Sequence, residues 1–184
     1  VKPGIKCGIP HEYGSTGFGV FHAAVVAAHH QKKNIEGMTV AIEGLGNVGS
    51  FAAKYLSDAG ARIVGISDSR GLLYSSEGID IKKIFNVKEK TGSVINYKPG
   101  QVMASHDIVG LDVDVLITAA IPDLIKISDV PQVKAKIIIE GSNIPMTSEV
   151  EDLLHKRNIL VVPDFVANAG GVISSYAEYK GKNP

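Results

Sequence analysis

Three glycines at positions 44, 46 and 49 form a G-x-G-x-x-G pattern within the sequence GLGNVG. This spacing permits a tight turn at the first glycine, close approach of a phosphate to the backbone at the second, and close packing of the following helix at the third. The free N–H groups at the start of that helix can bind a pyrophosphate. Glycine-rich turns also occur for purely structural reasons, but here the pattern predicts a dinucleotide site. Its backbone contacts would come from Gly44, Leu45, Gly46, Asn47, Val48 and Gly49.

An acidic residue stands where a dinucleotide site requires one. Asp68 follows the last glycine by 19 positions and ends an apolar segment, residues 61–67, so its carboxylate could accept hydrogen bonds from an adenosine ribose. That carboxylate favours NAD, because it repels a 2′-phosphate. Arg70, with Ser67 or Ser69 as a further donor, could instead bind the 2′-phosphate of NADP. Asp68 could equally have a structural role at the turn, and Arg70 could be solvated, so the sequence predicts use of NAD or NADP.

The elements around the glycines have the order that such a site needs. Residues 40–42 form a short apolar strand, and apolar positions recur at helical spacing over residues 48–59. Further strands are predicted at 61–67, 114–118, 136–140 and 159–162, and further helices at 17–33, 81–91, from Thr147 or Ser148 onward, and at 170–179. Residues 69–78 are interpreted as a connector, and residues 93–110 as a loop with a helical turn near His106.

Apolar strands that alternate with helices indicate a parallel sheet covered on both faces. We therefore expect an α/β fold: a Rossmann-like, doubly wound, mostly parallel sheet. Ligands bind beyond the carboxyl ends of the strands in such sheets. The residues that directly follow the predicted strands should meet at that edge, namely Gly44, Asp68, Ala119 with Ala120, Asn143 and Asp164.

The composition is that of an ordinary globular chain and limits its partners. Of the 184 residues, 45% are hydrophobic and 21% charged, and 19 Lys and Arg balance 19 Asp and Glu. No overall field attracts nucleic acid or an anionic membrane, and no apolar run approaches the ~20 residues of a membrane span. The single cysteine, Cys7, fits a reducing, cytoplasmic compartment. We expect no metal, because no carboxylate completes a ligand set with His22, His29 and His30.

Five segments, in the right order, make the chain similar to the glutamate dehydrogenase family, within the wider glutamate/leucine/phenylalanine/valine dehydrogenases. Residues 15–20 (STGFGV) resemble A-T-G-R-G-V, residues 43–49 (EGLGNVG) resemble Q-G-F-G-N-V-G, and residues 67–71 (SDSRG) resemble S-D-S-K-G. Residues 140–145 (EGSNIP) resemble E-G-A-N-G-P, and residues 163–176 (PDFVANAGGVISSY) resemble P-D-x-x-x-N-A-G-G-V-x-x-S-Y. The resemblance covers essentially the whole chain, but only the cofactor-binding domain of the family.

The resemblance implies roles that spacing alone does not assign. Thr16 and Asn47 would contact the nicotinamide cofactor, and Asn143 and Asn168 would lie near the nicotinamide and its ribose. The pocket for glutamate or 2-oxoglutarate would be lined by Val172 and Ser175, with Ser175 donating to a substrate carboxylate. Without the resemblance, asparagine after a strand is more typical of turns, and a serine in a helix bonds to the preceding turn.

Two departures from the family pattern stand out. Phe18 occupies the position of an arginine, so any polar contact made there is lost or supplied elsewhere. Ile144 and Met146 replace a glycine and a threonine-like residue, which could reshape the loop after Asn143. Neither departure touches the glycine turn.

The groups that would carry out the chemistry are absent from this chain. Reductive amination needs a group to polarise a 2-oxo carbonyl and a base to move protons to and from ammonia. In the family these are a lysine and an aspartate on a preceding domain, in motifs such as G-G-x-K-G and P-D-x-G-T, and neither motif occurs here. We expect no catalytic residue in this chain.

Residues 1–184 are accordingly interpreted as the NAD(P)-binding domain of a longer, homo-oligomeric enzyme, with an irregular leading segment at residues 1–16. That enzyme would catalyse the reversible oxidative deamination of L-glutamate to 2-oxoglutarate and ammonia, and this chain would be inactive alone. One alternative is a stand-alone nucleotide-binding module with a regulatory role. Another keeps the chemistry but acts on leucine, valine or phenylalanine. Ser175 favours the enzyme over the regulatory module, since a nucleotide sensor has no need of it.

Overall fold

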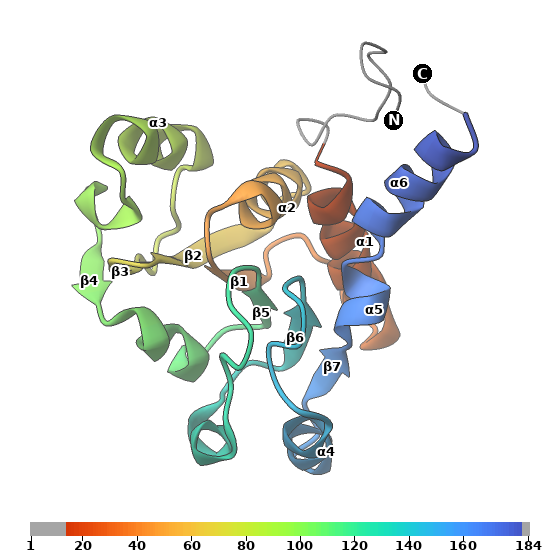
Figure 1. Cartoon of the computed structure of the whole chain (residues 1–184). Coiled ribbons are helices and arrows are strands. Elements are labelled where there is room, and N and C mark those ends of the chain that lie inside the picture. Colours follow the sequence, from red (N-terminus) through yellow and green to blue (C-terminus); the bar gives the residue numbers. More distant parts are fainter. Residues whose placement is uncertain (1–13, 182–184) are drawn as a thin grey trace.

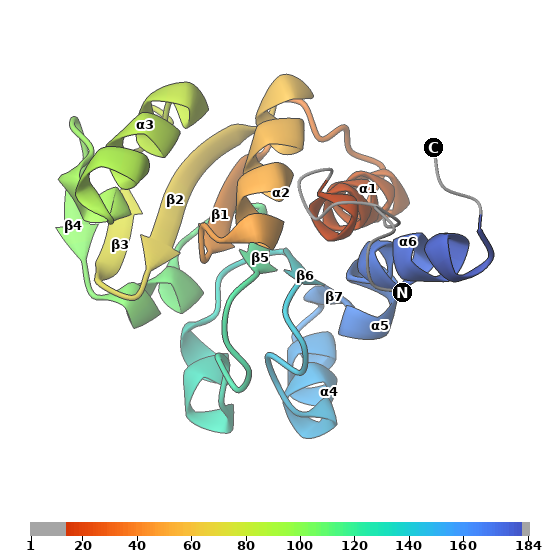
Figure 2. The ribbon, with the colours of Figure 1, turned by 45° about the horizontal axis from the view of Figure 1, so that its top comes forward.

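The computed structural model describes residues 14–181. Predictions for residues 1–13, including Cys7 and most of the leading segment, lie outside the described residues. Seven strands form one sheet in the order β4-β3-β2-β1-β5-β6-β7, with helices on both faces (Figures 1 and 2). The strands are β1 (Thr39–Glu43), β2 (Arg62–Asp68), β3 (Gly71–Tyr74), β4 (Gln101–Met103), β5 (Val115–Thr118), β6 (Ile137–Glu140) and β7 (Leu160–Val162). The α-helices are α1 (Ser15–His30), α2 (Asn47–Asp58), α3 (Ile81–Thr91), α4 (Ser148–Lys156), α5 (Asp164–Ala167) and α6 (Gly170–Tyr179).

The direction in which strands are added reverses at β1. From β1 the chain adds β2 on one side, and later β5, β6 and β7 on the other, and all of these neighbours pair in parallel. Such a reversal creates a crevice at the carboxyl ends of the two strands that flank it, here β1 and β5. The predicted doubly wound α/β fold is confirmed.

Each face of the sheet has its own hydrophobic core. In β1, Val40 and Ile42 pack on one face while Ala41 packs on the other, as the two-residue period of a strand requires. The first core packs against α1, α2 and α3, and the second against α4 and the 3₁₀ turns at residues 105–110 and 127–132. Figure 2 shows α2 and α3 above the sheet and α4 below it. Burial on both faces explains why these strands are nearly continuous apolar runs.

Two predicted connections contain strands instead. The segment interpreted as a connector, residues 69–78, includes β3, and the loop predicted at 93–110 includes β4. Both strands are antiparallel to their neighbours, since β3 pairs with β2 and β4 pairs with β3. They are four and three residues long and are defined by pairing with distant strands rather than by their own periodicity. The helical turn predicted near His106 is present, at residues 105–110.

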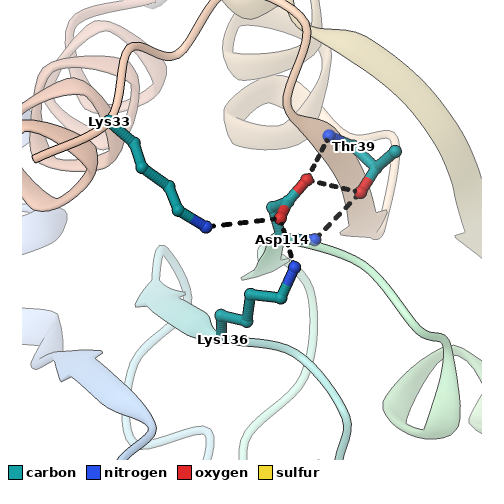
Figure 3. Close-up of polar contacts among 4 residues, drawn as sticks. All are labelled: Lys33, Thr39, Asp114 and Lys136. Carbon is teal, nitrogen blue, oxygen red and sulfur yellow. Dashed lines mark hydrogen bonds and ion pairs between the residues drawn. The ribbon is translucent and has the colours of Figure 1, made fainter. Parts of the chain in front are cut away.

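The amino-terminal ends of β1 and β5 are joined by a charged network centred on Asp114. One carboxylate oxygen, Oδ2, accepts the backbone N–H of Thr39 at 3.0 Å and its hydroxyl at 2.9 Å. The other, Oδ1, accepts Lys136 Nζ at 2.7 Å and lies 4.0 Å from Lys33 Nζ (Figure 3). Burial opposes ionisation of Asp114, but the hydrogen bonds from Lys136 and Thr39 outweigh it and lower the pKa to about 2. This network holds the amino-terminal ends of the strands together, and the candidate site lies at their opposite, carboxyl ends.

Candidate functional site

The glycine turn has the geometry that its sequence predicts. Gly44 has φ +88°, a conformation that other residues rarely adopt. A Cβ on Gly49 would lie 1.9 Å from the carbonyl oxygen of Gly44, so only glycine lets α2 pack this closely on the turn. A Cβ on Gly46 would meet nothing within 4 Å. The space above Gly46 is therefore open to a ligand, next to the amino-terminal end of α2, where a helix favours an anion.

A cleft of about 770 Å³ lies beside this turn, at the carboxyl ends of β5 and β6. It is lined from the turn side by Val48 and from the β5 side by Ala119 and Ala120. The structure brings eight of the predicted site residues together in its wall: Thr16, Val48, Ala119, Ala120, Asn143, Asn168, Val172 and Ser175. Pro122, Gly141, Ser142, Ile144 and Gly171 complete the lining and were not predicted as site residues.

Two asparagines from different elements meet in this cleft. Asn143 follows β6, and Asn168 directly follows α5. The side-chain Nδ2 of Asn168 donates to Oδ1 of Asn143 at 2.9 Å. The pair therefore presents a fixed set of amide groups at the cleft wall, which local turn chemistry alone would not have produced.

Helix α6 packs closely against the start of α1 (Figure 1). A Cβ on Gly170 would lie 2.1 Å from the carbonyl oxygen of Ser15, and one on Gly171 would lie 2.6 Å from the hydroxyl of Thr16. Ser174 makes the ordinary bond to the preceding turn, donating to Gly171 O at 2.9 Å. Its neighbour Ser175 is exposed and lines the cleft.

Asp68 lies on the other side of the glycine turn, outside the cleft, and already has protein partners. Its Oδ2 accepts the backbone N–H of Val94 at 2.8 Å. Its Oδ1 accepts the hydroxyl of Ser93 at 3.1 Å and the backbone N–H of Arg70 at 2.9 Å. Burial raises the pKa of Asp68, but these hydrogen bonds outweigh it and the net pKa is lowered. The carboxylate thus has the structural role at the turn that the sequence left open, with its charge retained.

Lys88 brings a positive charge to the glycine turn, and it was not predicted as a site residue. Lys88 belongs to α3, and its Nζ donates to the carbonyl oxygen of Leu45 at 2.6 Å. Burial lowers the pKa of Lys88, and the nearby Asp68 opposes that shift. Only the packing of α3 beside the turn brings Lys88 there, so helical spacing could not have revealed it.

Two buried glutamates support the loops of the cleft, and neither was predicted. Glu43, before the glycine turn, holds Ala119 and Ala120 through its side chain. Glu140, at the end of β6, accepts the backbone N–H of Asp164 through Oε2 at 3.0 Å, while its Oε1 is buried without a partner in the described residues. Burial and the nearby charge of Glu151 raise the pKa of Glu140 to about 7.

The departures from the family pattern are accommodated locally. Phe18 packs edge-on against the rings of His22 and Tyr55, with ring centroids 4.3 and 5.3 Å apart. The residue at this position therefore makes aromatic contacts. Ile144 adopts φ +46°, the left-handed region that glycine favours, and its side chain is 62% exposed. Met146 is buried in the core beneath α4.

None of the helices in the described part of the chain is long and apolar enough to cross a membrane. Within residues 14–181, no group of three or more His, Cys, Asp or Glu side chains could hold a metal ion.

Comparison with known proteins places this architecture in a family. Residues 7–183 match the family model described as glutamate/leucine/phenylalanine/valine dehydrogenase. The NADP-specific glutamate dehydrogenase of Saccharolobus shibatae is 44% identical over 178 residues, covering 97% of this chain and 42% of the relative. The NAD-specific glutamate dehydrogenase of Staphylococcus aureus is 41% identical over 169 residues, covering 92% of this chain and 41% of the relative.

A solved structure agrees with these sequence relatives. The hetero-hexameric glutamate dehydrogenase of Thermus thermophilus, in its Leu-bound form, superposes with a TM-score of 0.84 at 29% identity, covering 92% of this chain and 40% of the other. The chain thus spans about two-fifths of the length of the curated relatives that it matches. On its sequence motifs, its fold and this match over nearly all of its length, the chain belongs to the glutamate/leucine/phenylalanine/valine dehydrogenase family.

Proposed function

We propose that this chain is the NAD(P)-binding domain of a glutamate dehydrogenase, which in the intact enzyme oxidatively deaminates L-glutamate to 2-oxoglutarate and ammonia. The observation that carries the proposal is the glycine turn at the reversal point of the sheet. Gly49 allows α2 to begin directly against Gly44, and Gly46 leaves open space over the amino-terminal end of α2. The relatives of this chain include both an NADP-specific and an NAD-specific glutamate dehydrogenase.

The two sides of the glycine turn suit the two halves of a dinucleotide. The pyrophosphate would lie on the backbone of residues 44–49. The adenosine half would extend toward Asp68, Ser69 and Arg70, and the nicotinamide half into the cleft beside Asn143 and Asn168. Thr16 and Asn47 would contact the cofactor, whose nicotinamide, when bound, accepts the hydride from glutamate.

Val172 and Ser175 would bind the amino-acid substrate next to the nicotinamide. Both lie in α6 and line the same cleft as the two asparagines. The hydroxyl of Ser175 would donate to a substrate carboxylate, and Val172 would supply an apolar wall. The lysine and aspartate that polarise the carbonyl and move protons would come from the part of the enzyme outside this chain, so we expect no turnover of glutamate by residues 1–184 alone. We place the intact enzyme in the cytoplasm as a homo-oligomer.

Replacing Gly46 tests the proposed function with little risk to the fold. Gly46 has φ −83°, which any residue can adopt, and its Cβ would meet no protein atom within 4 Å. We expect Gly46→Val to unfold at the same temperature as the unaltered chain and to lose NAD(H) and NADP(H) binding, because the valine occupies the space of the pyrophosphate. Isothermal titration calorimetry measures both affinities. Unchanged affinity in the valine variant would contradict the assignment of this turn.

A further inference from the structure

Glu43 makes an unusual set of contacts directly beneath the candidate site. It ends β1 immediately before the glycine turn, and it is only 5% exposed. Its Oε2 accepts the backbone N–H groups of Ala119 and Ala120, at 3.0 and 2.9 Å. Its own backbone oxygen also accepts the N–H of Ala119, at 2.8 Å. A single residue of β1 therefore holds the first two residues that follow β5.

Burying the carboxylate of Glu43 costs free energy, which suggests a role beyond filling space. Burial of a carboxylate is unfavourable unless hydrogen bonds compensate for the lost water. Among residues 14–181 Glu43 forms no ion pair, and backbone amides are its partners. Burial raises the pKa of Glu43, and the amides of Ala119, Ala120 and Ile121 act in the opposite direction.

The segment that Glu43 holds forms a wall of the cleft. Ala119 and Ala120 both line it. The same segment is pressed against the glycine turn, because a Cβ on Gly44 would lie 2.6 Å from the Cβ of Ala120. Residues 119–121 are thus fixed on the turn side by this steric contact and from below by the carboxylate of Glu43. The wall lies on the β5 side of the turn, whereas Asp68 lies on the β2 side.

We propose that Glu43 is a positioning residue of the dinucleotide site, which holds residues 119–121 as the wall against which the nicotinamide half of the cofactor packs. This inference rests on the proposed function. Glu43 acts through the N–H groups of Ala119 and Ala120 and does not touch the cofactor. The adenosine diphosphate half, bound by the glycine turn and the Asp68 side, does not depend on this wall.

Titration with the whole dinucleotide and with ADP, which is part of it, separates this role from general damage to the fold. The unaltered protein, Glu43→Leu and Glu43→Gln are each titrated with ADP and with NADH or NADPH, whichever binds the unaltered protein more tightly. Leucine removes the acceptor, whereas glutamine keeps a carbonyl oxygen of equal reach. We expect Glu43→Leu to bind the dinucleotide about tenfold or more weakly, the effect of losing hydrogen bonds to a charged group. Its affinity for ADP should stay within about twofold of the original, and Glu43→Gln should recover most of the dinucleotide affinity.

Other outcomes overturn the inference in distinguishable ways. Equal loss of ADP and dinucleotide binding in Glu43→Leu would show that the whole turn, rather than the wall, depends on Glu43. Unchanged dinucleotide binding in Glu43→Leu would show that the wall needs no such support. If Glu43→Leu does not fold, Glu43→Asp replaces it, since its shorter side chain cannot reach both amides and should show the same selective loss. Failure of the unaltered protein to bind either ligand would contradict the proposed function itself.

Discussion

The carboxylate of Asp68 accepts the backbone N–H of Val94 at 2.8 Å, which ties the end of β2 to the segment that follows α3. The residue that a dinucleotide site would use to recognise the adenosine ribose is therefore also a structural anchor. A carboxylate oxygen can accept more than one hydrogen bond, so this anchor does not prevent a contact with the ribose. It does mean that Asp68 alone does not decide between the two cofactors.

Arg70 is expected to distinguish NADP from NAD. Its guanidinium lies near Gly92, and its backbone N–H donates to Asp68, the residue predicted to contact the ribose. We expect the protein to use both cofactors, and Arg70→Ala to weaken NADP(H) binding by about 1.5–3 kcal/mol while sparing NAD(H). Competitive titration of the two cofactors measures the difference. Lys82→Ala, which removes an exposed charge from α3, is the matched control. Equal losses for both cofactors in Arg70→Ala would show that Arg70 does not contact the 2′-phosphate.

Asp114 should stabilise the fold in a pH-dependent manner. Its pKa is about 2 in the folded state, below the value of about 3.9 expected for an unfolded chain. The stabilisation is present above the unfolded pKa and is lost as the pH falls from about 4 through 2. We expect Asp114→Asn to lower the free energy of unfolding by about 1–2 kcal/mol at pH 7, and by less at pH 3. Urea titrations at both pH values measure this. Asp112→Asn, at an exposed carboxylate two residues away, should have little effect.

Glu140 should have the opposite effect to Asp114 on the pH dependence of stability. Its folded pKa of about 7 lies above the ordinary value of 4.5, so the folded state binds the proton more tightly than the unfolded state. The free energy of unfolding should therefore fall as the pH rises from about 4.5 through 7. We expect Glu140→Gln to raise stability by up to about 3 kcal/mol at pH 8 and by much less at pH 5. Denaturant titration of Glu140→Gln and of the exposed Glu149→Gln control gives both values. An equal gain at the two pH values would show that Glu140 does not titrate in this range.

The left-handed backbone conformation of Ile144 is expected to lower the stability of the fold. A left-handed conformation costs an L-residue roughly 1–2 kcal/mol, and a glycine there loses about 0.5–1 kcal/mol of chain entropy instead. Because the side chain is 62% exposed, little packing is lost on its removal. We expect Ile144→Gly to raise the free energy of unfolding by about 0.5–1 kcal/mol. Ile144→Ala, which keeps a Cβ, should gain less, and thermal unfolding compares the two. A loss of stability in Ile144→Gly would show that the isoleucine side chain makes contacts that outweigh the strain.

The sequence by itself determined the central strand, glycine turn and helix. These depend on local properties: the φ of Gly44, the lack of a side chain at Gly49, and the helical period of the residues that follow. The parallel strands were also predictable, because burial on both faces makes each a short apolar run. Since the carboxyl ends of parallel strands meet at one edge, the positions of Ala119 and Asn143 in a common cleft followed from the strand assignments.

Only the tertiary structure decided which side chains meet around that edge. The strands β3 and β4 are too short to show a period, and each is defined by pairing, β3 with the open edge of β2 and β4 with the open edge of β3. Lys88 reaches Leu45 across 43 positions of sequence, and Glu43 reaches Ala120 across 77. Two partners of Asp68, Ser93 and Val94, lie 25 and 26 positions away. Contacts at such separations depend on how helices and loops pack on the sheet, and no local pattern of residues encodes them.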